Sequence, residues 1–223
     1  MIRTTDSLAS LASQSPAAAR VFRRHQLDYY CRGDRPLASA CQAASLDPTW
    51  VAAEIEAEGR GSTAVEDWVT RSVAELVRQI LARYHEPLHP EILRLQELAR
   101  SVENVHAAKP DCPRGLVGHL ESMGYSLEEH LAREEEIVFP LLVHGQFERA
   151  APAIRAMRAE HDQHAQALRR TRVLTRDFRM PAEACETWRA LSSGLEELER
   201  DLMDHMHVEN YVLFPRALEL VGR

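Results

Sequence analysis

Two segments of the chain carry the same pattern of chemically active residues. HLAREEEIVFP at 130–140 and HMHVENYVLFP at 205–215 both read His-x-x-x-Glu-x-x-x-x-Phe-Pro. Residues four apart lie on the same face of a helix, so the imidazole and the carboxylate of each segment can point into one site. Mixed imidazole and carboxylate ligation suits iron or manganese, and zinc can also take it. The repeat therefore indicates a metal site to which two helices contribute.

Both motifs continue an apolar stripe. The residues before them follow alternating steps of four and three, namely Leu116, Leu120, Met123 and Leu127 before the first motif and Leu191, Leu195, Leu198 and Leu202 before the second. This spacing predicts the face of a helix that points to a bundle core. A buried carboxylate is costly unless it is paired, and a bound cation would compensate two of them at once.

Two further histidines complete the predicted ligand set. His85 lies on a stripe with Leu81, Leu88, Ile92 and Leu95, and His161 lies on one with Ile154, Met157 and Leu168. The predicted metal ligands are His85, His130, Glu134, His161, His205 and Glu209. Four imidazoles and two carboxylates are too many for one metal and suit two, with both glutamates bridging. A bridging oxo or hydroxo group would leave an open position on each metal for a small diatomic molecule.

Three polar residues near the ligands are ambiguous. His89 lies four residues after His85, and His164 lies three after His161. For both, a role in orienting the ligands or in a polar core is favoured over direct ligation. Glu160 could accept or relay a proton beside the site, although an exposed helix carboxylate is slightly favoured.

The remaining residues of the two motifs are expected to lie outside the ligand set. His207 is only two residues from Glu209 and faces elsewhere on a helix, toward solvent or behind the ligands. Glu135 and Glu136 are expected at the surface, and the Phe-Pro pairs are interpreted as packing followed by helix termination. In the alternative without a metal, the histidines are satisfied by hydrogen bonds and the glutamates lie at the surface.

The elements that must position these residues are four long helices. They are predicted at about 71–107, 114–143, 148–178 and 182–218, with Pro87 and Pro90 expected to kink or interrupt the first. Short breaks between them favour an up-down-up-down four-helix bundle in residues 68–223. Residues 1–62 are predicted to form a small module of short helices, and GRGS at 59–62 resembles a linker.

Composition excludes several classes of protein. The formal net charge is −7 without a long basic run, which argues against a nucleic-acid binder. The chain has neither 18 consecutive apolar residues nor an apolar stretch at its start, so no membrane association and a cytoplasmic location are expected. Its four cysteines, Cys31, Cys41, Cys112 and Cys185, lack Cys-x-x-Cys spacing, which suits a reducing compartment and excludes a zinc ribbon.

These motifs resemble those of a known family. The paired His-x-x-x-Glu…Phe-Pro segments and the bundle-wide histidines are similar to a hemerythrin-like di-iron domain. Over essentially its full length the chain resembles the Repair of Iron Centres proteins. The supporting stretches are LDYYCRGDRPLASAC, RYHEPLHPEI, EHLAREEEIVFP, AEHDQHAQ and LMDHMHVENYVLFPRAL.

The resemblance implies a cytoplasmic stress protein with two non-haem iron ions, bridged by oxo or hydroxo and carboxylate groups. Its implied clients are iron–sulfur proteins damaged by nitric oxide or oxidants. The family's ligands fall on the six residues named above. Iron donation and nitric oxide handling are both implied, and a homodimer is left open.

Two departures from the family pattern bear on function. Classical hemerythrins carry a second histidine four residues after the first on the third helix, where this chain has Ala165. Its absence fits a centre that is more open than that of an oxygen carrier. The family's adjacent cysteines are replaced by Tyr30 and Cys31, so a vicinal dithiol role is excluded. Cys31 alone is equally consistent with packing and with a reactive thiol.

Three functions compete at this point. The first is a di-iron protein that repairs iron–sulfur clusters, the second is a hemerythrin-like carrier or sensor of oxygen or nitric oxide, and the third is a di-iron nitric oxide reductase or peroxidase. Whether the protein is an enzyme is left open. The ligand set together with the N-terminal module favours the first function.

Overall fold

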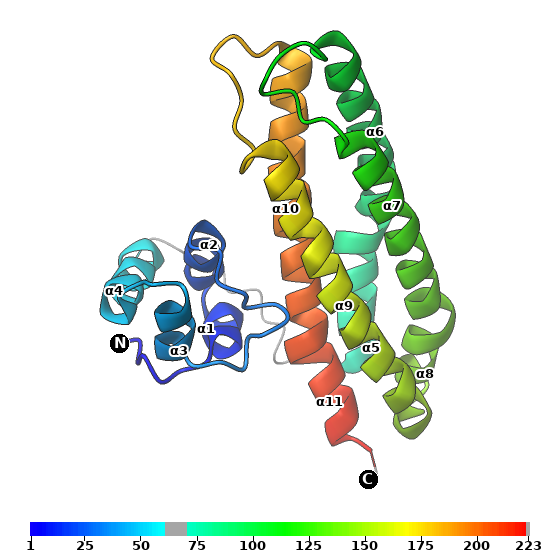
Figure 1. Cartoon of the computed structure of the whole chain (residues 1–223). Helices are drawn as coiled ribbons and strands as arrows, with labels where there is room; N and C mark the ends of the chain where they lie inside the picture. The colour runs from blue at the N-terminus through cyan, green and yellow to red at the C-terminus, as the bar shows by residue number, and fades with distance from the viewer. Residues whose placement is uncertain (61–70, 222–223) are drawn as a thin grey trace. The chain divides into compact units, whose positions relative to one another are not determined.

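The computed structural model describes residues 1–60 and 71–221, and every regular element in them is a helix (Figure 1). This confirms the all-α prediction. The helices are α1 (Leu8–Gln14), α2 (Pro16–Arg24), α3 (Leu37–Ala43), α4 (Pro48–Gly59), α5 (Val73–Ile80), α6 (Glu86–Val105), α7 (Leu116–Arg133), α8 (Phe139–Val143), α9 (Phe147–Thr175), α10 (Glu186–Val208) and α11 (Phe214–Glu219). Three π-helical turns, η1 (Leu81–His85), η2 (Glu134–Val138) and η3 (Glu209–Leu213), lie between them.

The chain divides into two compact units. One is Met1–Leu76 together with the residues from Met203 onward, and the other is Val77–Leu202. The divisions fall inside the continuous helices α5 and α10. The predicted boundary between residues 62 and 68, and half of the predicted GRGS linker, fall on 61–70, which lie outside the described residues.

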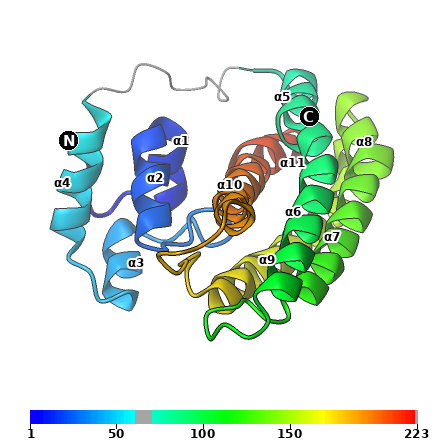
Figure 2. The same ribbon diagram turned by 90° about the horizontal axis from the view of Figure 1, so that it is seen from above.

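The unit Val77–Leu202 is a four-helix bundle. Its long helices are α6, α7 with its extension into α8, α9 and the larger part of α10, and α6 and α9 both pack against α7 (Figure 2). The connections between them are residues 106–115, 144–146 and 176–185, and consecutive helices alternate in direction, as predicted. The core consists of fully buried apolar side chains that include Leu95, Leu116, Leu120, Ile154 and Leu195.

The short helices of the other unit begin at residues that favour helix starts. The Ser7 hydroxyl accepts a hydrogen bond from the Ser10 N–H, and the Asp47 carboxylate accepts one from the Thr49 N–H at 2.8 Å. Such caps satisfy the N–H groups that have no partner within the first turn. Pro16 and Pro48 are the first residues of α2 and α4, where the missing N–H costs nothing.

The three π turns all coincide with predicted metal ligands. His85 is the last residue of η1, Glu134 is the first of η2, and Glu209 is the first of η3. In each turn an N–H donates to the carbonyl five residues earlier, in the pairs Glu86–Leu81, Phe139–Glu134 and Phe214–Glu209. Such turns occur frequently at functional sites, because one extra residue rotates the side chains that follow.

A proline follows each π turn within two residues, at Pro87, Pro140 and Pro215. Proline has no N–H to donate and its ring collides with the carbonyl four residues earlier, so a regular helix cannot pass through it unchanged. Here the wider turn precedes each proline and the helix continues. The prediction that Phe-Pro ends the helices is therefore wrong, because α8 and α11 begin at those phenylalanines. The predicted interruption near Pro87 is the η1 turn, and Pro90 lies within α6.

The close approach of α6 and α7 depends on Gly124. A Cβ atom there would lie 2.9 Å from Gln96 Nε2 and 3.3 Å from Ile92 Cγ1. We expect Gly124→Val to lower the free energy of unfolding by about 2 kcal/mol, because overpacking a tight helix contact typically costs 1–3 kcal/mol. Urea unfolding would measure it. Gly118→Val on the same helix is the control, since nothing lies within 4 Å of its Cβ position, and equal losses in both variants would contradict this packing.

Candidate metal centre

Four of the six predicted ligands lie buried in the unit Val77–Leu202. The exposed fractions are 4% for His85, 2% for His130, and 0% for Glu134 and His161. Glu134 Oε2 lies 3.5 Å from His85 Nε2 and 3.4 Å from His130 Nε2, so one carboxylate faces two rings from different helices. His130 Nε2 in turn lies 3.2 Å from His161 Nε2.

The outer ring nitrogens show which atoms these histidines present to the site. His85 Nδ1 lies 2.8 Å from Glu135 Oε1, and His130 Nδ1 lies 2.8 Å from Glu160 Oε2. A carboxylate only accepts hydrogen bonds, so each Nδ1 carries the proton. In the neutral rings each Nε2 then presents a lone pair toward Glu134. Lone pairs that converge with a carboxylate in a buried space are what a cation requires.

The last two predicted ligands share one stretch of helix at the end of α10. His205 Nε2 lies 3.1 Å from Glu209 Oε1, and the two side chains are 2% and 0% exposed. Their spacing of four residues places both on one face, as the motif predicts. This pair has the same chemistry as His130 and Glu134.

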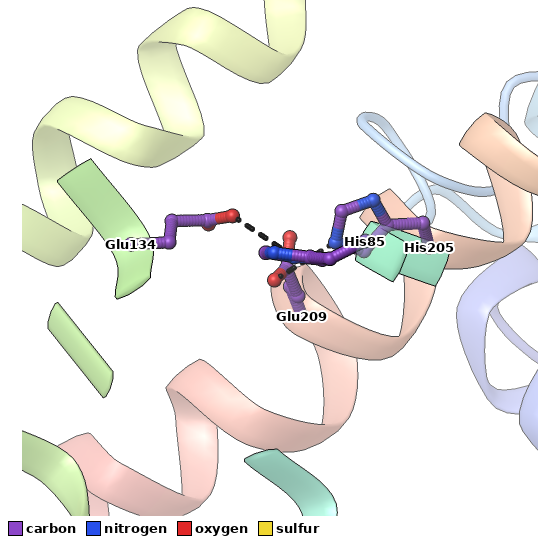
Figure 3. A group of neighbouring side chains, drawn as sticks. All are labelled: His85, Glu134, His205 and Glu209. Atoms are coloured by element: carbon purple, nitrogen blue, oxygen red, sulfur yellow. Dashed lines mark ion pairs between the residues drawn. The ribbon is translucent and has the colours of Figure 1, made fainter. Parts of the chain in front are cut away.

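The potential ligand atoms fall into two groups. One contains His85, Glu134, His205 and Glu209, and the other contains His130, Glu134, His161 and Glu209; within each group these atoms lie within 4.8 Å of one another. Figure 3 draws the first group, with the His85–Glu134 and His205–Glu209 ion pairs dashed. Both carboxylates belong to both groups. The donor set, imidazole nitrogens with shared carboxylate oxygens, fits a pair of divalent or trivalent transition-metal ions.

Two carboxylates, Glu160 and Glu135, contact the predicted ligand histidines more closely than the sequence indicated. Glu160, for which an exposed role was slightly favoured, is only 21% exposed and accepts hydrogen bonds from His130 and from the Arg133 guanidinium at 2.9 Å. Glu135 is at the surface, as predicted, but it also holds His85. A sign of the Glu135 contact was its place one residue after a predicted ligand, since carboxylates commonly orient ligand histidines from behind.

The two ambiguous histidines differ in position. His164 is 3% exposed, and its ring packs edge-on against the His130 ring with centroids 4.8 Å apart. His89 is exposed and pairs with Glu128 at 3.0 Å. His164 is therefore placed to hold the His130 ring, whereas His89 pairs with a surface carboxylate.

The opposite face of the His205–Glu209 stretch contacts the N-terminal helices. His207 is buried, not at the surface: its Nδ1 donates to the Tyr29 carbonyl at 3.3 Å, and its Nε2 accepts from the Ser13 hydroxyl at 3.0 Å. Burial lowers the pKa of His207 to about 4, so the ring is neutral at pH 7. Both ring nitrogens of His207 are engaged by residues of the N-terminal region, which agrees with its exclusion from the predicted ligand set.

Further contacts on that face involve the loop after α2, residues 27–33. Asn210 Nδ2 donates to the Tyr30 carbonyl at 2.8 Å, and the Tyr211 hydroxyl accepts from the Gly33 N–H at 2.6 Å. Cys31 lies half-buried in the same loop. The segment that carries His205 and Glu209 is thus held from behind by hydrogen bonds that are local to its own unit.

Comparison with known proteins covers both parts of the chain. The hemerythrin HHE cation binding domain matches residues 76–217, and the ScdA_N domain, a domain of unknown function, matches residues 4–58. The iron-sulfur cluster repair protein YtfE of Yersinia pseudotuberculosis serotype IB (strain PB1/+) is 40% identical over 212 residues, which cover 95% of this chain and 96% of the relative. The protein of the same name from Yersinia pestis (strain Pestoides F) gives the same values. None of the helices in residues 1–60 and 71–221 combines the length and apolarity that a membrane span requires.

Asp204 offers a test of the contact behind the ligands. Its Oδ1 accepts from the Tyr29 hydroxyl and from Arg23 NH1, both at 2.7 Å, and Tyr29 is fully buried. We expect Asp204→Ala to lower the free energy of unfolding by about 3 kcal/mol, because it removes the carboxylate that accepts hydrogen bonds from a buried hydroxyl and a largely buried guanidinium. Thermal unfolding would measure the loss.

The matched control is Asp201→Ala, one turn earlier on the same helix, where the carboxylate is 39% exposed and pairs only with its neighbour Arg200 among the described residues. A change below about 0.5 kcal/mol is expected there. If the two variants were equally stable, the contact of Asp204 with Tyr29 and Arg23 would not hold the helix end.

Proposed function

We propose, on the premise that the chain belongs to the family of hemerythrin-like iron–sulfur cluster repair proteins, that it holds two iron ions and uses them to restore damaged iron–sulfur clusters. The observation that carries the proposal is that two groups of four ligand atoms share both carboxylates. In this assignment His85 and His205 serve one ion, and His130 and His161 serve the other. Glu134 and Glu209, which belong to both groups, would be available to both ions.

Charge balance supports a pair of ions. Glu134 and Glu209 are both fully buried, and two negative charges in a helical core require compensation of several kcal/mol each. When bound, two iron ions would compensate these charges and supply redox and Lewis-acid chemistry. The protein would contribute imidazole nitrogens, two carboxylates that belong to both groups, and buried surroundings that exclude water.

The role in repair follows from the relatives. At 40% identity over 95% of the chain, the relatives are named for iron–sulfur cluster repair. The clients of this protein would accordingly be iron–sulfur proteins whose clusters have lost iron. Nitric oxide and oxygen are the small molecules that an iron pair with an open position would bind, and the absence of a second imidazole at Ala165 favours such an opening over stable oxygen storage.

The metal content of matched variants tests the site. Protein from iron-replete expression is expected to contain two irons per chain, and Glu134→Ala is expected to lose at least one, because it removes a ligand shared by both groups. Glu136→Ala is the control, since Glu136 lies in the same motif but is exposed. Elemental analysis with thermal unfolding separates loss of metal from loss of fold. Protein that folds but binds no metal would refute the proposal.

A reactivation assay tests the function. The probe is a purified [4Fe–4S] enzyme that has been inactivated by nitric oxide and is incubated anaerobically with a reductant. We expect the iron-loaded protein to restore its activity, and the iron-free protein or the Glu134→Ala variant to restore little. Reversible oxygen or nitric oxide binding without reactivation would instead favour a carrier or sensor.

A further inference from the structure

The two sides of the centre are held by carboxylates in different surroundings. Behind His130, Glu160 is 21% exposed and is itself bound by the Arg133 guanidinium. Behind His85, Glu135 is 47% exposed, and no lysine or arginine of the described residues pairs with it. A carboxylate in water holds its partner less firmly than one that is screened from water and fixed by a cation.

The His130 ring is also held by neighbouring rings. The His130 ring lies edge-on against the rings of His161 and His164, with centroids 4.9 and 4.8 Å away, and both neighbours are buried. The His85 ring has a tilted contact with Phe139 at 5.4 Å. The His85 ring also lines a pocket.

This pocket, of about 220 Å³, lies between α6 and α7. Its walls are mostly apolar, and its polar lining residues are His85, His89, Glu128 and Glu135. Since His89 and Glu128 are 59% and 51% exposed, the pocket reaches solvent. It ends at the ligand that Glu135 holds.

We propose that the two ion positions are unequal: the position served by His85 exchanges its ion through this pocket, while the position served by His130 and His161 retains its ion. The inference rests on the proposed function, because it presupposes two bound ions. It identifies the part of the centre from which iron can be donated. Glu135 acts on the ion only through His85, and is therefore a positioning residue.

Release of iron to a chelator tests the inequality. Protein loaded with two equivalents of Fe(II) is mixed anaerobically with excess ferrozine, and the coloured complex is followed with time. The wild type is expected to lose one equivalent quickly and the other slowly. Glu135→Gln is expected to accelerate the fast phase about ten-fold, since loss of a partner behind a ligand typically weakens metal binding 10–100-fold. Its slow phase should stay unchanged.

Glu160→Gln is the matched variant on the other side. It is expected to accelerate only the slow phase, which assigns each phase to one histidine. Ala132→Phe, at an exposed wall position of the pocket, is expected to slow the fast phase several-fold by filling the space. Ala156→Phe, at an exposed position of α9 away from the pocket, should change neither phase.

The results separate this inference from the proposed function. A protein that binds two irons and releases both at one rate would overturn the inequality alone. So would a fast phase that responds to Glu160→Gln but not to Glu135→Gln, or that is indifferent to Ala132→Phe. A folded protein that binds no iron would overturn both the proposed function and this inference.

Discussion

Two fully buried carboxylates, Glu134 and Glu209, are the constraint on which the rest of the structure depends. In a helical core an ionised carboxylate is tolerated only where opposite charge or strong donors meet it. Imidazole nitrogens lie 3.1–3.5 Å from these two carboxylates. In His85 and His130 an outer carboxylate accepts a hydrogen bond from the far nitrogen, so in the neutral ring the near nitrogen offers a lone pair to the site. A bound cation would stabilise both carboxylates, with the same residues as its predicted ligands.

The helices are adapted to that requirement locally. Each of these glutamates is followed six residues later by a proline. A proline normally interrupts a regular α-helix, because it has no N–H to donate and its ring collides with the carbonyl four residues earlier. The π turns that begin at Glu134 and Glu209 lengthen the hydrogen bond to five residues and let the chain pass Pro140 and Pro215 as helix. Each proline is therefore better understood as the residue that favours a wider turn at the ligand. Phe139 then packs beside His85, which links this turn to the neighbouring ligand helix.

The periodicity of the sequence predicted the bundle and the six candidate ligands because those side chains repeat on the scale of one helix. Glu134 and His130 are four apart, and their neighbours on the stripe are leucines, so a single helix carries the signal. The contact of Glu135 with His85 joins different helices, and the sequence alone does not encode which outer residue meets which ring. The π turns were not predicted for a similar reason. Pro140 excludes a regular helix, but the helix can either end before the proline or continue after a wider turn, and the sequence does not distinguish the two. His207 was expected outside the ligand set, but its burial depends on Tyr29 and Ser13, far away in sequence.

The helix end that carries His205 and Glu209 has to satisfy two sets of contacts at once. Its ligands occupy one face, while Asp204, His207 and Asn210 bind the α1–α2 region and the loop after it. Because side chains on opposite faces of one helix share a backbone, a shift in that loop displaces the ligands by a similar amount. A metal centre depends on ligand placement within a few tenths of an ångström. The short N-terminal helices therefore contribute to the centre without supplying a ligand, which gives a physical reason for the joint presence of both parts in one chain.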